Sequence, residues 1–190
     1  MTKLPMIILI GKTASGKDTV AQELIQELNA KIITGVTTRP KRPGEVHGVD
    51  HYFTTNEKFD RFLQAGELVG TYEVDVFDND GNPAVWRYGI PSHRLGVGKI
   101  LVSNPDSLES ILRAQEQSVV ICIEASVEER RERYRSRNPY ASAKELERRI
   151  TEEESAFARA YEKGLIDFVV DNTESLDETI RNIKIFLEQL

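Results

Sequence analysis

The sequence of 190 residues has one cysteine and no long hydrophobic run. Cys122 therefore has no partner for an internal disulfide, which fits a reducing compartment. It lies in an apolar segment, 119–123, where we expect a small buried hydrophobic residue and not a reactive thiol. No stretch approaches the ~18 consecutive apolar residues of a membrane-spanning helix, and the apolar run near the N-terminus is too short for a signal peptide. We therefore expect a cytoplasmic protein without a membrane partner.

The sequence also lacks excess positive charge and clusters of metal ligands. Its formal net charge of −6 argues against a general nucleic-acid-binding surface, although it permits a local basic site. His47, His51 and His93 have no metal-ligand spacing and no cysteine partners, which argues against a structural zinc. No internal repeat is present, and the length suits one domain with a full core or one core that carries small inserted lobes.

The stretch MIILIGKTASGKDT, residues 6–19, has the pattern of a phosphate-binding P-loop. Apolar residues 6–10 predict a buried strand, and the glycines at 11 and 16 permit a loop whose N–H groups surround a phosphate. A helix beginning near Lys17 points its positive end at the anion, and the Lys17 ammonium is placed for the β- and γ-phosphates of ATP. The predicted ATP contacts in this loop are Gly11, Lys12, Thr13, Ala14, Ser15, Gly16, Lys17, Asp18 and Thr19.

Asp18 stands where the motif usually has serine or threonine. Because Mg²⁺ prefers oxygen ligands and keeps several waters, a carboxylate at this position can hold the ion directly or through water. We therefore predict Asp18 as the metal ligand and Mg²⁺ as the cofactor.

Apolar strands alternate with amphipathic helices over most of the chain. Strands are expected at 6–10, 31–36, 100–103, 119–124 and 166–170, and helices at 17–28, 106–114, 126–137, 142–161 and 175–187. This alternation predicts an α/β fold with a parallel sheet covered on both faces.

The block 37–90 interrupts the alternation. It contains a proline- and glycine-rich basic segment, a helix from about residue 56 to Gly66, and a hairpin of strands 67–77 and 84–90. We interpret it as an inserted lobe that closes over a ligand at the P-loop. Arg39 and Arg42, three residues apart in a proline-braced loop, are suited to bind one phosphate of an acceptor through their planar guanidinium groups.

The P-loop followed by TTRPKRPGE (37–45), Gly48 and DHYF (50–53) resembles the guanylate kinase family. The resemblance continues through Tyr88-Gly89, an arginine set and VVDN (169–172), and so covers nearly the whole chain. It implies a P-loop kinase core (1–36, 91–134 and 149–190), an acceptor-binding lobe (37–90) and a helical lid (135–148). The implied reaction is ATP + GMP → ADP + GDP, with Mg²⁺.

The resemblance also implies roles for arginines beyond the P-loop. It places Arg137 and Arg148 on the lid and Arg133 at its approach, where they contact the ATP phosphates and the transferring group. The implied catalytic residues are Lys17, Arg39, Arg137 and Arg148, with Arg133 and Arg137 binding ATP. The competing interpretation is a solvated helix face, because the 128–137 region is densely charged.

Several positions depart from the family pattern. A phosphate-binding tyrosine is replaced by His51, a guanine-reading glutamate by Gly70, a base-contacting serine by Ile90, and an acidic residue by Asn104. Tyr88 matches a phosphate-contacting tyrosine, and Glu73 or Asp75 of the long hairpin is available to replace the lost carboxylate. The predicted acceptor-binding residues are Arg39, Arg42, His51, Glu73, Tyr88 and Asn104.

Three functions stay open at this point. The first is an ATP-dependent kinase acting on GMP or dGMP, with small nucleotides as its only partners. The second is a similar phosphotransferase with a different acceptor, such as another nucleotide or a ribose phosphate. The third is a non-catalytic binding module, which Lys17 argues against because such modules lose this lysine. The sequence leaves open whether the protein is a monomer or a homodimer.

Overall fold

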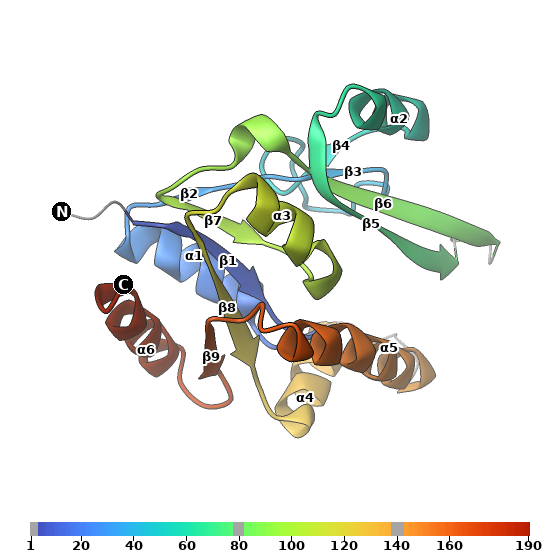
Figure 1. The fold of residues 1–190 in the computed structure, drawn as a ribbon. Coiled ribbons are helices and arrows are strands. Elements are labelled where there is room, and N and C mark those ends of the chain that lie inside the picture. The colour runs from blue at the N-terminus through green and yellow to red at the C-terminus, as the bar shows by residue number, and fades with distance from the viewer. Residues whose placement is uncertain (1–3, 78–81, 138–142) are drawn as a thin grey trace. The chain divides into compact units, whose positions relative to one another are not determined.

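The computed structural model describes residues 4–77, 82–137 and 143–190 of the chain (Figure 1). The chain divides into two compact units. The first comprises Met1–Ile32, Val97–Pro105 and Gln117–Leu190, and the second comprises Ile33–Gly96 and Asp106–Glu116. No helix among the described residues is long and apolar enough to cross a membrane.

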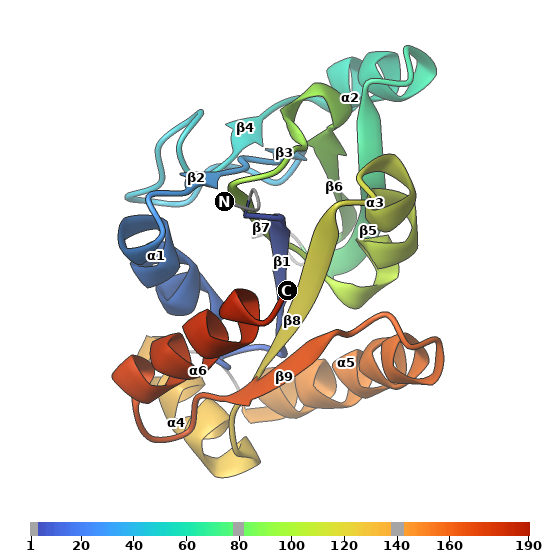
Figure 2. The same ribbon diagram turned by 60° about the vertical axis from the view of Figure 1, so that its left-hand side comes forward.

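The first unit is built on a five-stranded sheet in the order β2-β7-β1-β8-β9 (Figure 2). Its strands are β1 (Met6–Ile10), β2 (Lys31–Ile32), β7 (Lys99–Val102), β8 (Ser118–Glu124) and β9 (Phe168–Asp171). All neighbouring pairs are parallel, and β1 lies between β7 and β8 with every residue buried. The predicted α/β fold with a parallel sheet is confirmed.

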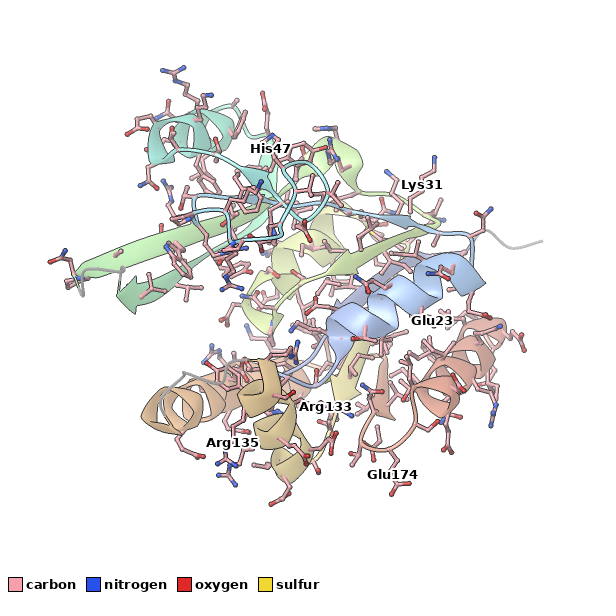
Figure 3. All side chains as sticks on the ribbon, turned by 180° about the vertical axis from the view of Figure 1, so that it is seen from behind. Glu23, Lys31, His47, Arg133, Arg135 and Glu174 are labelled. Atoms are coloured by element: carbon pink, nitrogen blue, oxygen red, sulfur yellow. The ribbon has the colours of Figure 1, made fainter. Side chains whose placement is uncertain are left out.

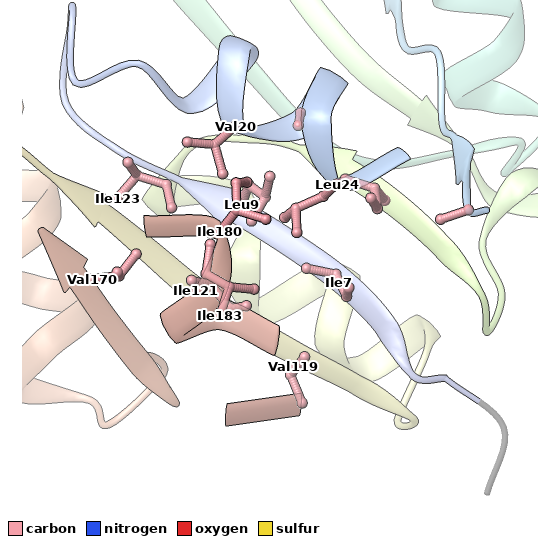
Figure 4. Packing of buried hydrophobic residues seen from close by; sticks show 13 residues of the cluster. Ile7, Leu9, Val20, Leu24, Val119, Ile121, Ile123, Val170, Ile180 and Ile183 are labelled. Carbon is pink, nitrogen blue, oxygen red and sulfur yellow. The ribbon is translucent and has the colours of Figure 1, made fainter. Parts of the chain in front are cut away.

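Helices cover both faces of this sheet. They are α1 (Lys17–Glu27), α4 (Val127–Arg137), α5 (Ala143–Glu162) and α6 (Leu176–Glu188). On one face, Val20 and Leu24 of α1 and Ile183 of α6 pack against Leu9 and Ile121 of the sheet (Figure 4). This apolar stripe at helical spacing explains why α1 and α6 form where the sequence predicts them.

The opposite face of the sheet carries Cys122, which is completely buried. The Tyr161 hydroxyl of α5 approaches the Cys122 sulfur at 3.7 Å and donates to a carboxylate oxygen of Glu124 at 2.7 Å. Burial raises the pKa of the Cys122 thiol to about 11, so the thiolate is disfavoured. Cys122 is a packing residue, as predicted.

The second unit contains a four-stranded sheet in the order β4-β3-β6-β5. Its elements are β3 (Val36–Thr37), β4 (Tyr52–Phe53), α2 (Asn56–Gln64), β5 (Leu68–Phe77), β6 (Pro83–Pro91) and α3 (Leu108–Ala114). The predicted hairpin is the antiparallel β5–β6 pair. Short 3₁₀ helices occur at Ser92–Arg94 and Pro105–Ser107.

The prediction of a single strand over residues 31–36 is wrong. The chain leaves the first sheet after Ile32 of β2, and Val36 of β3 pairs with Tyr52 and Gly89 in the second sheet. Gly35 permits the close passage, because a Cβ there would lie 3.2 Å from the Gly89 carbonyl oxygen. Both halves of the segment are apolar, and an apolar run does not indicate that the chain changes sheets.

Candidate active site

The P-loop joins β1 to α1 and has the backbone geometry of an anion cradle. Gly16 has φ 92°, in the left-handed region, and Ala14 adopts φ 63°, which is uncommon for a residue with a side chain. A Cβ on Gly16 would collide with the Asn172 amide nitrogen, and one on Gly11 would lie 2.6 Å from the Ile123 carbonyl oxygen. Both glycines of the motif are therefore required by conformation or by close contact.

Lys17 and Asp18 open α1, and their backbone groups lie at the helix end that carries partial positive charge. The Lys17 side chain is half-buried, and Asp18 and Thr19 are exposed in the first turn. The exposed Asp18 carboxylate supplies an oxygen ligand of the kind that Mg²⁺ prefers. Since the described residues contain no group of three or more acidic, histidine or cysteine ligands, an ion here would depend on phosphate and water for its other ligands.

Arg133 and Asn172 fix the middle of the loop from outside. The Asn172 side-chain nitrogen donates to the Ser15 carbonyl oxygen at 2.8 Å, and Arg133 Nη1 donates to the same oxygen at 3.3 Å. Arg133 also bonds the carbonyl oxygen of Asn172 and the carboxylate of Glu129. Figure 3 shows Arg133 on α4 beside the loop. The structure thus brings Arg133 to the P-loop, where it donates to one backbone carbonyl group, that of Ser15.

Sequence reasoning missed a second set of contacts at the loop. The Thr13 amide donates to both carboxylate oxygens of Glu153, at 3.0 and 2.8 Å, and the Thr13 hydroxyl donates to Glu153 as well. Arg130 Nε donates to the Thr13 carbonyl oxygen at 2.9 Å. Lys12 pairs with Glu154 at 2.6 Å. The charged stretches of α4 and α5 gave no signal that singles out these residues.

The structure defines less about the two arginines predicted to lie on a lid. Arg137 ends α4 with an exposed side chain, and its Nε donates to the Arg133 carbonyl oxygen at 3.5 Å. Arg148 lies on α5, but its side chain is outside the described part of the chain. Residues 138–142 of the predicted lid are also outside it. The catalytic roles of Arg137 and Arg148 stay predictions.

In the second unit, Arg39 is 4% exposed and forms a two-point ion pair with Glu45. Arg39 Nη2 lies 2.6 Å from one Glu45 oxygen and Nη1 lies 3.0 Å from the other. Glu45 also accepts the Arg42 amide at 2.7 Å, which closes the loop on itself. Burial acts to lower the pKa of Arg39, but its bonds to Glu45 and Tyr88 outweigh this and raise it. The guanidinium is therefore a permanent positive charge.

The hydrogen bonds from Arg39 and from the Arg42 amide lower the pKa of Glu45 to about 2. A carboxyl of the unfolded chain titrates near about 4.3. Since the folded pKa is lower, Glu45 stabilises the fold fully above the unfolded value and loses this contribution as the pH falls towards 2. We expect urea unfolding between pH 5 and pH 2 to show a steeper acid loss of stability for wild type than for Glu45→Gln. Parallel curves for the two proteins would contradict the ion pair.

Aromatic rings gather beside Arg39. Tyr72 and Tyr88 stack with ring centroids 4.9 Å apart, and His51 lies 6.1 Å from Tyr88. The Arg39 guanidinium lies over Phe53 at 5.5 Å. The structure thus brings together three predicted acceptor-binding residues, Arg39, His51 and Tyr88, and the nearby Arg42 backbone, whereas the Arg42 side chain is exposed.

Glu73 does not join this group. It lies opposite Arg87 in the β5–β6 register, one position beyond the Tyr72–Tyr88 pair, so its side chain is on the other face of the hairpin. There it lies 3.2 Å from Arg87, which also pairs with Asp60 of α2. Asp75 shares the Glu73 face. Asn104, half-buried, follows β7 in the first unit.

Positions 70 and 90, which align with base-reading residues of the family, are packed against apolar neighbours. Ile90 is buried, and Gly70 has φ 57° at an irregularity in the β5–β6 register. The Gly70 amide donates to the Ser110 hydroxyl at 3.0 Å. A Cβ on Gly70 would lie 2.8 Å from two side-chain carbons of Ile111. Neither position therefore offers a side-chain group that hydrogen-bonds a base.

This packing predicts that Gly70→Ala destabilises the protein. The substitution combines a left-handed backbone with a steric overlap, and we expect a loss of about 2–4 kcal/mol in the free energy of unfolding. Gly66→Ala is the matched control, because Gly66 also has a positive φ of 67° but nothing within 4 Å of a Cβ. Urea denaturation measures both. Equal losses for the two variants would show that Ile111 does not close the space above residue 70.

A P-loop at the end of a central parallel strand, together with a loop in the second unit that carries the buried Arg39, defines the class of P-loop phosphotransferases. Comparison with known proteins gives the family. A sequence model described as guanylate kinase matches residues 3–190. The chain belongs to the guanylate kinase family, whose members are P-loop nucleoside monophosphate kinases.

Individual relatives agree. The chain is similar to a guanylate kinase of Wolbachia pipientis wMel, with 29% identity over 97% of this chain and 89% of the relative. A guanylate kinase of Symbiobacterium thermophilum is 43% identical over 36% of this chain and 33% of the relative. The crystal structure of guanylate kinase from Anaplasma phagocytophilum matches 100% of this chain and 87% of that chain, with a TM-score of 0.71 and 25% identity.

Proposed function

We propose that this protein transfers the γ-phosphoryl group of ATP to GMP or dGMP. The observation that carries the proposal is that one chain of this family holds both a P-loop with its two glycines and Lys17 and a loop with Arg39 and Arg42. Phosphoryl transfer needs charged groups in fixed positions more than a covalent nucleophile, and these two loops supply them.

Each loop has a separate role in this proposal. Lys17 and the P-loop amides other than that of Thr13, which donates to Glu153, bind the ATP phosphates, and Arg39, Arg42 and Tyr88 bind the acceptor phosphate. Asp18 is suited to hold Mg²⁺, which when bound neutralises charge on the phosphates. Arg137 and Arg148 are proposed to reach the transferring group. A cytoplasmic location and the absence of nucleic-acid or membrane partners stay predictions from composition.

Base recognition differs from the family pattern. Gly70 has no side chain, Ile90 has no hydrogen-bonding group, and Glu73 is on the other face of the hairpin from Tyr88. A site that reads a base through paired polar groups rejects the wrong base strongly, and losing those groups weakens the rejection. We therefore expect GMP to be the preferred acceptor but with modest preference over other purine monophosphates.

The test is ADP formation from ATP with a panel of acceptors: GMP, dGMP, IMP, AMP, CMP, UMP and ribose 5-phosphate. We expect turnover with GMP and dGMP, and slower turnover with IMP or AMP. Turnover with ribose 5-phosphate alone, or with pyrimidine nucleotides alone, would contradict the proposed acceptor. No turnover with any acceptor and no ATP binding would show a non-catalytic module.

A further inference from the structure

Two charged side chains, Arg130 of α4 and Glu153 of α5, contact Thr13 of the P-loop. We call these three residues the Thr13 clamp. Glu153 of α5 accepts from the Thr13 amide and hydroxyl, while Arg130 of α4 donates to the Thr13 carbonyl oxygen. Arg130 Nη2 and Glu153 pair at 3.3 Å. Both hydrogen-bonding groups of one P-loop peptide residue are thus held by two different helices.

Burial separates this clamp from the neighbouring surface ion pair. The Arg130 side chain is 3% exposed and that of Glu153 is 26% exposed, whereas Glu154, which pairs with Lys12, is 55% exposed. Exposed ion pairs contribute little because water and salt screen them. Arg130 is the buried member of the pair, and removing Glu153 would leave this buried charge without its partner, which is costly. Glu153, and not Glu154, is therefore the residue expected to matter.

The clamp lies next to a strained position. Ala14, the residue after Thr13, has φ 63°, and a left-handed conformation at a residue with a side chain persists only where its surroundings enforce it. The contacts of Ser15 with Asn172 and Arg133 hold the residue on the other side of Ala14. The strained residue is thus fixed from both sides before any ligand binds, which reduces the ordering that ATP must impose.

The clamp also joins the P-loop to the helix that carries a predicted lid arginine. Glu153 and Arg148 are on the same helix, α5, five residues apart. The clamp therefore connects Thr13 of the P-loop to the helix that carries Arg148.

We infer that Glu153 is a positioning residue for phosphoryl transfer. The Glu153 carboxylate, with Arg130, holds the first half of the P-loop in its ATP-binding conformation. This inference rests on the proposed function. Glu153 does not contact the reacting atoms in this account; it acts through the Thr13 backbone. The alternative is that the Glu153 carboxylate competes with ATP phosphate for the Thr13 amide. It would then have to leave when ATP binds, and removing its charge would strengthen ATP binding.

The test compares Glu153→Gln and Glu153→Ala with wild type and with Glu162→Gln, an exposed glutamate at the end of the same helix. Steady-state kinetics give KM for ATP and for GMP separately, and calorimetry gives ATP affinity. We expect kcat/KM for ATP to fall by about tenfold in the Gln variant and about 100-fold in the Ala variant, the cost of a misplaced phosphate site. KM for GMP and the Glu162→Gln kinetics should not change.

The relative losses of kcat/KM in the two Glu153 variants test the inference. Glutamine keeps an oxygen for the Thr13 amide but loses the charge that faces Arg130, so partial rescue relative to alanine is expected. A purely structural role would lower the melting temperature and the active fraction without raising KM for ATP, and would overturn the inference. Tighter ATP binding in Glu153→Gln would show a competitor and overturn it too. If wild type fails to form ADP with GMP, the proposed function fails; if wild type is active and Glu153→Gln matches it, only this inference fails.

Discussion

Replacing Lys17 by alanine is expected to lower kcat by about a thousandfold, the effect of removing one preorganised charge from a phosphoryl-transfer site. The Lys17 ammonium, at the start of α1, is proposed to lie against the β- and γ-phosphates, where negative charge changes position during transfer. Because Lys17 is half-buried at a helix end and not in the apolar core, the melting temperature should change little. Steady-state kinetics with saturating ATP and GMP measure the loss.

Lys31→Ala provides a control for the loss of one positive charge. Lys31 is an exposed residue of β2, labelled in Figure 3, and it has no part in the proposed site. Its substitution should leave kcat unchanged. Turnover of Lys17→Ala within tenfold of wild type would remove Lys17 from the mechanism.

Arg42→Ala should raise KM for GMP by about 10- to 100-fold, the range that follows from losing the charge-assisted hydrogen bonding of its guanidinium to a phosphate. Its side chain is exposed, and the Arg42 amide that bonds Glu45 is retained in alanine, so the loop should keep its shape. The ion pair between Arg39 and Glu45 should persist for the same reason. Kinetics at varied GMP and fixed ATP measure the effect.

Lys41→Ala is the matched control, since Lys41 is the adjacent exposed cation. We expect its KM for GMP to stay close to that of wild type, because the planar guanidinium and not the charge alone makes the two-point phosphate contact. ATP affinity, measured by calorimetry, should be the same in all three proteins. An equal loss of ATP affinity in Arg42→Ala would mean that the acceptor loop is misassigned.

Local sequence determined the P-loop and the general fold. Residues 6–19 form a strand, a loop and a helix because the buried strand, the two glycines and the helix start are contiguous, so each depends on its immediate neighbours. The hairpin is likewise predicted from two strand segments that are close together in the sequence. Alternation of apolar strands and helices was sufficient for the parallel sheet.

Tertiary structure decided which of several identical side chains contact the P-loop. Glu153 is the middle of three successive glutamates, and Arg130 is one of five arginines between residues 130 and 137. Nothing in their local pattern distinguishes them, because only the approach of Thr13, more than a hundred residues away, buries Arg130 and engages Glu153. The same holds for Glu73, whose pairing with Arg87 follows from the hairpin register.

The sequence by itself therefore determined the class of chemistry, through a contiguous phosphate-binding loop and an arginine loop whose residues lie close along the chain. Only the tertiary structure decided how those loops are held. It showed that position 70 has no room for a side chain beside Ile111 and that the segment 31–36 divides between two sheets. The physical reason is that burial and pairing of a charged side chain depend on residues distant in sequence, which a local pattern does not specify.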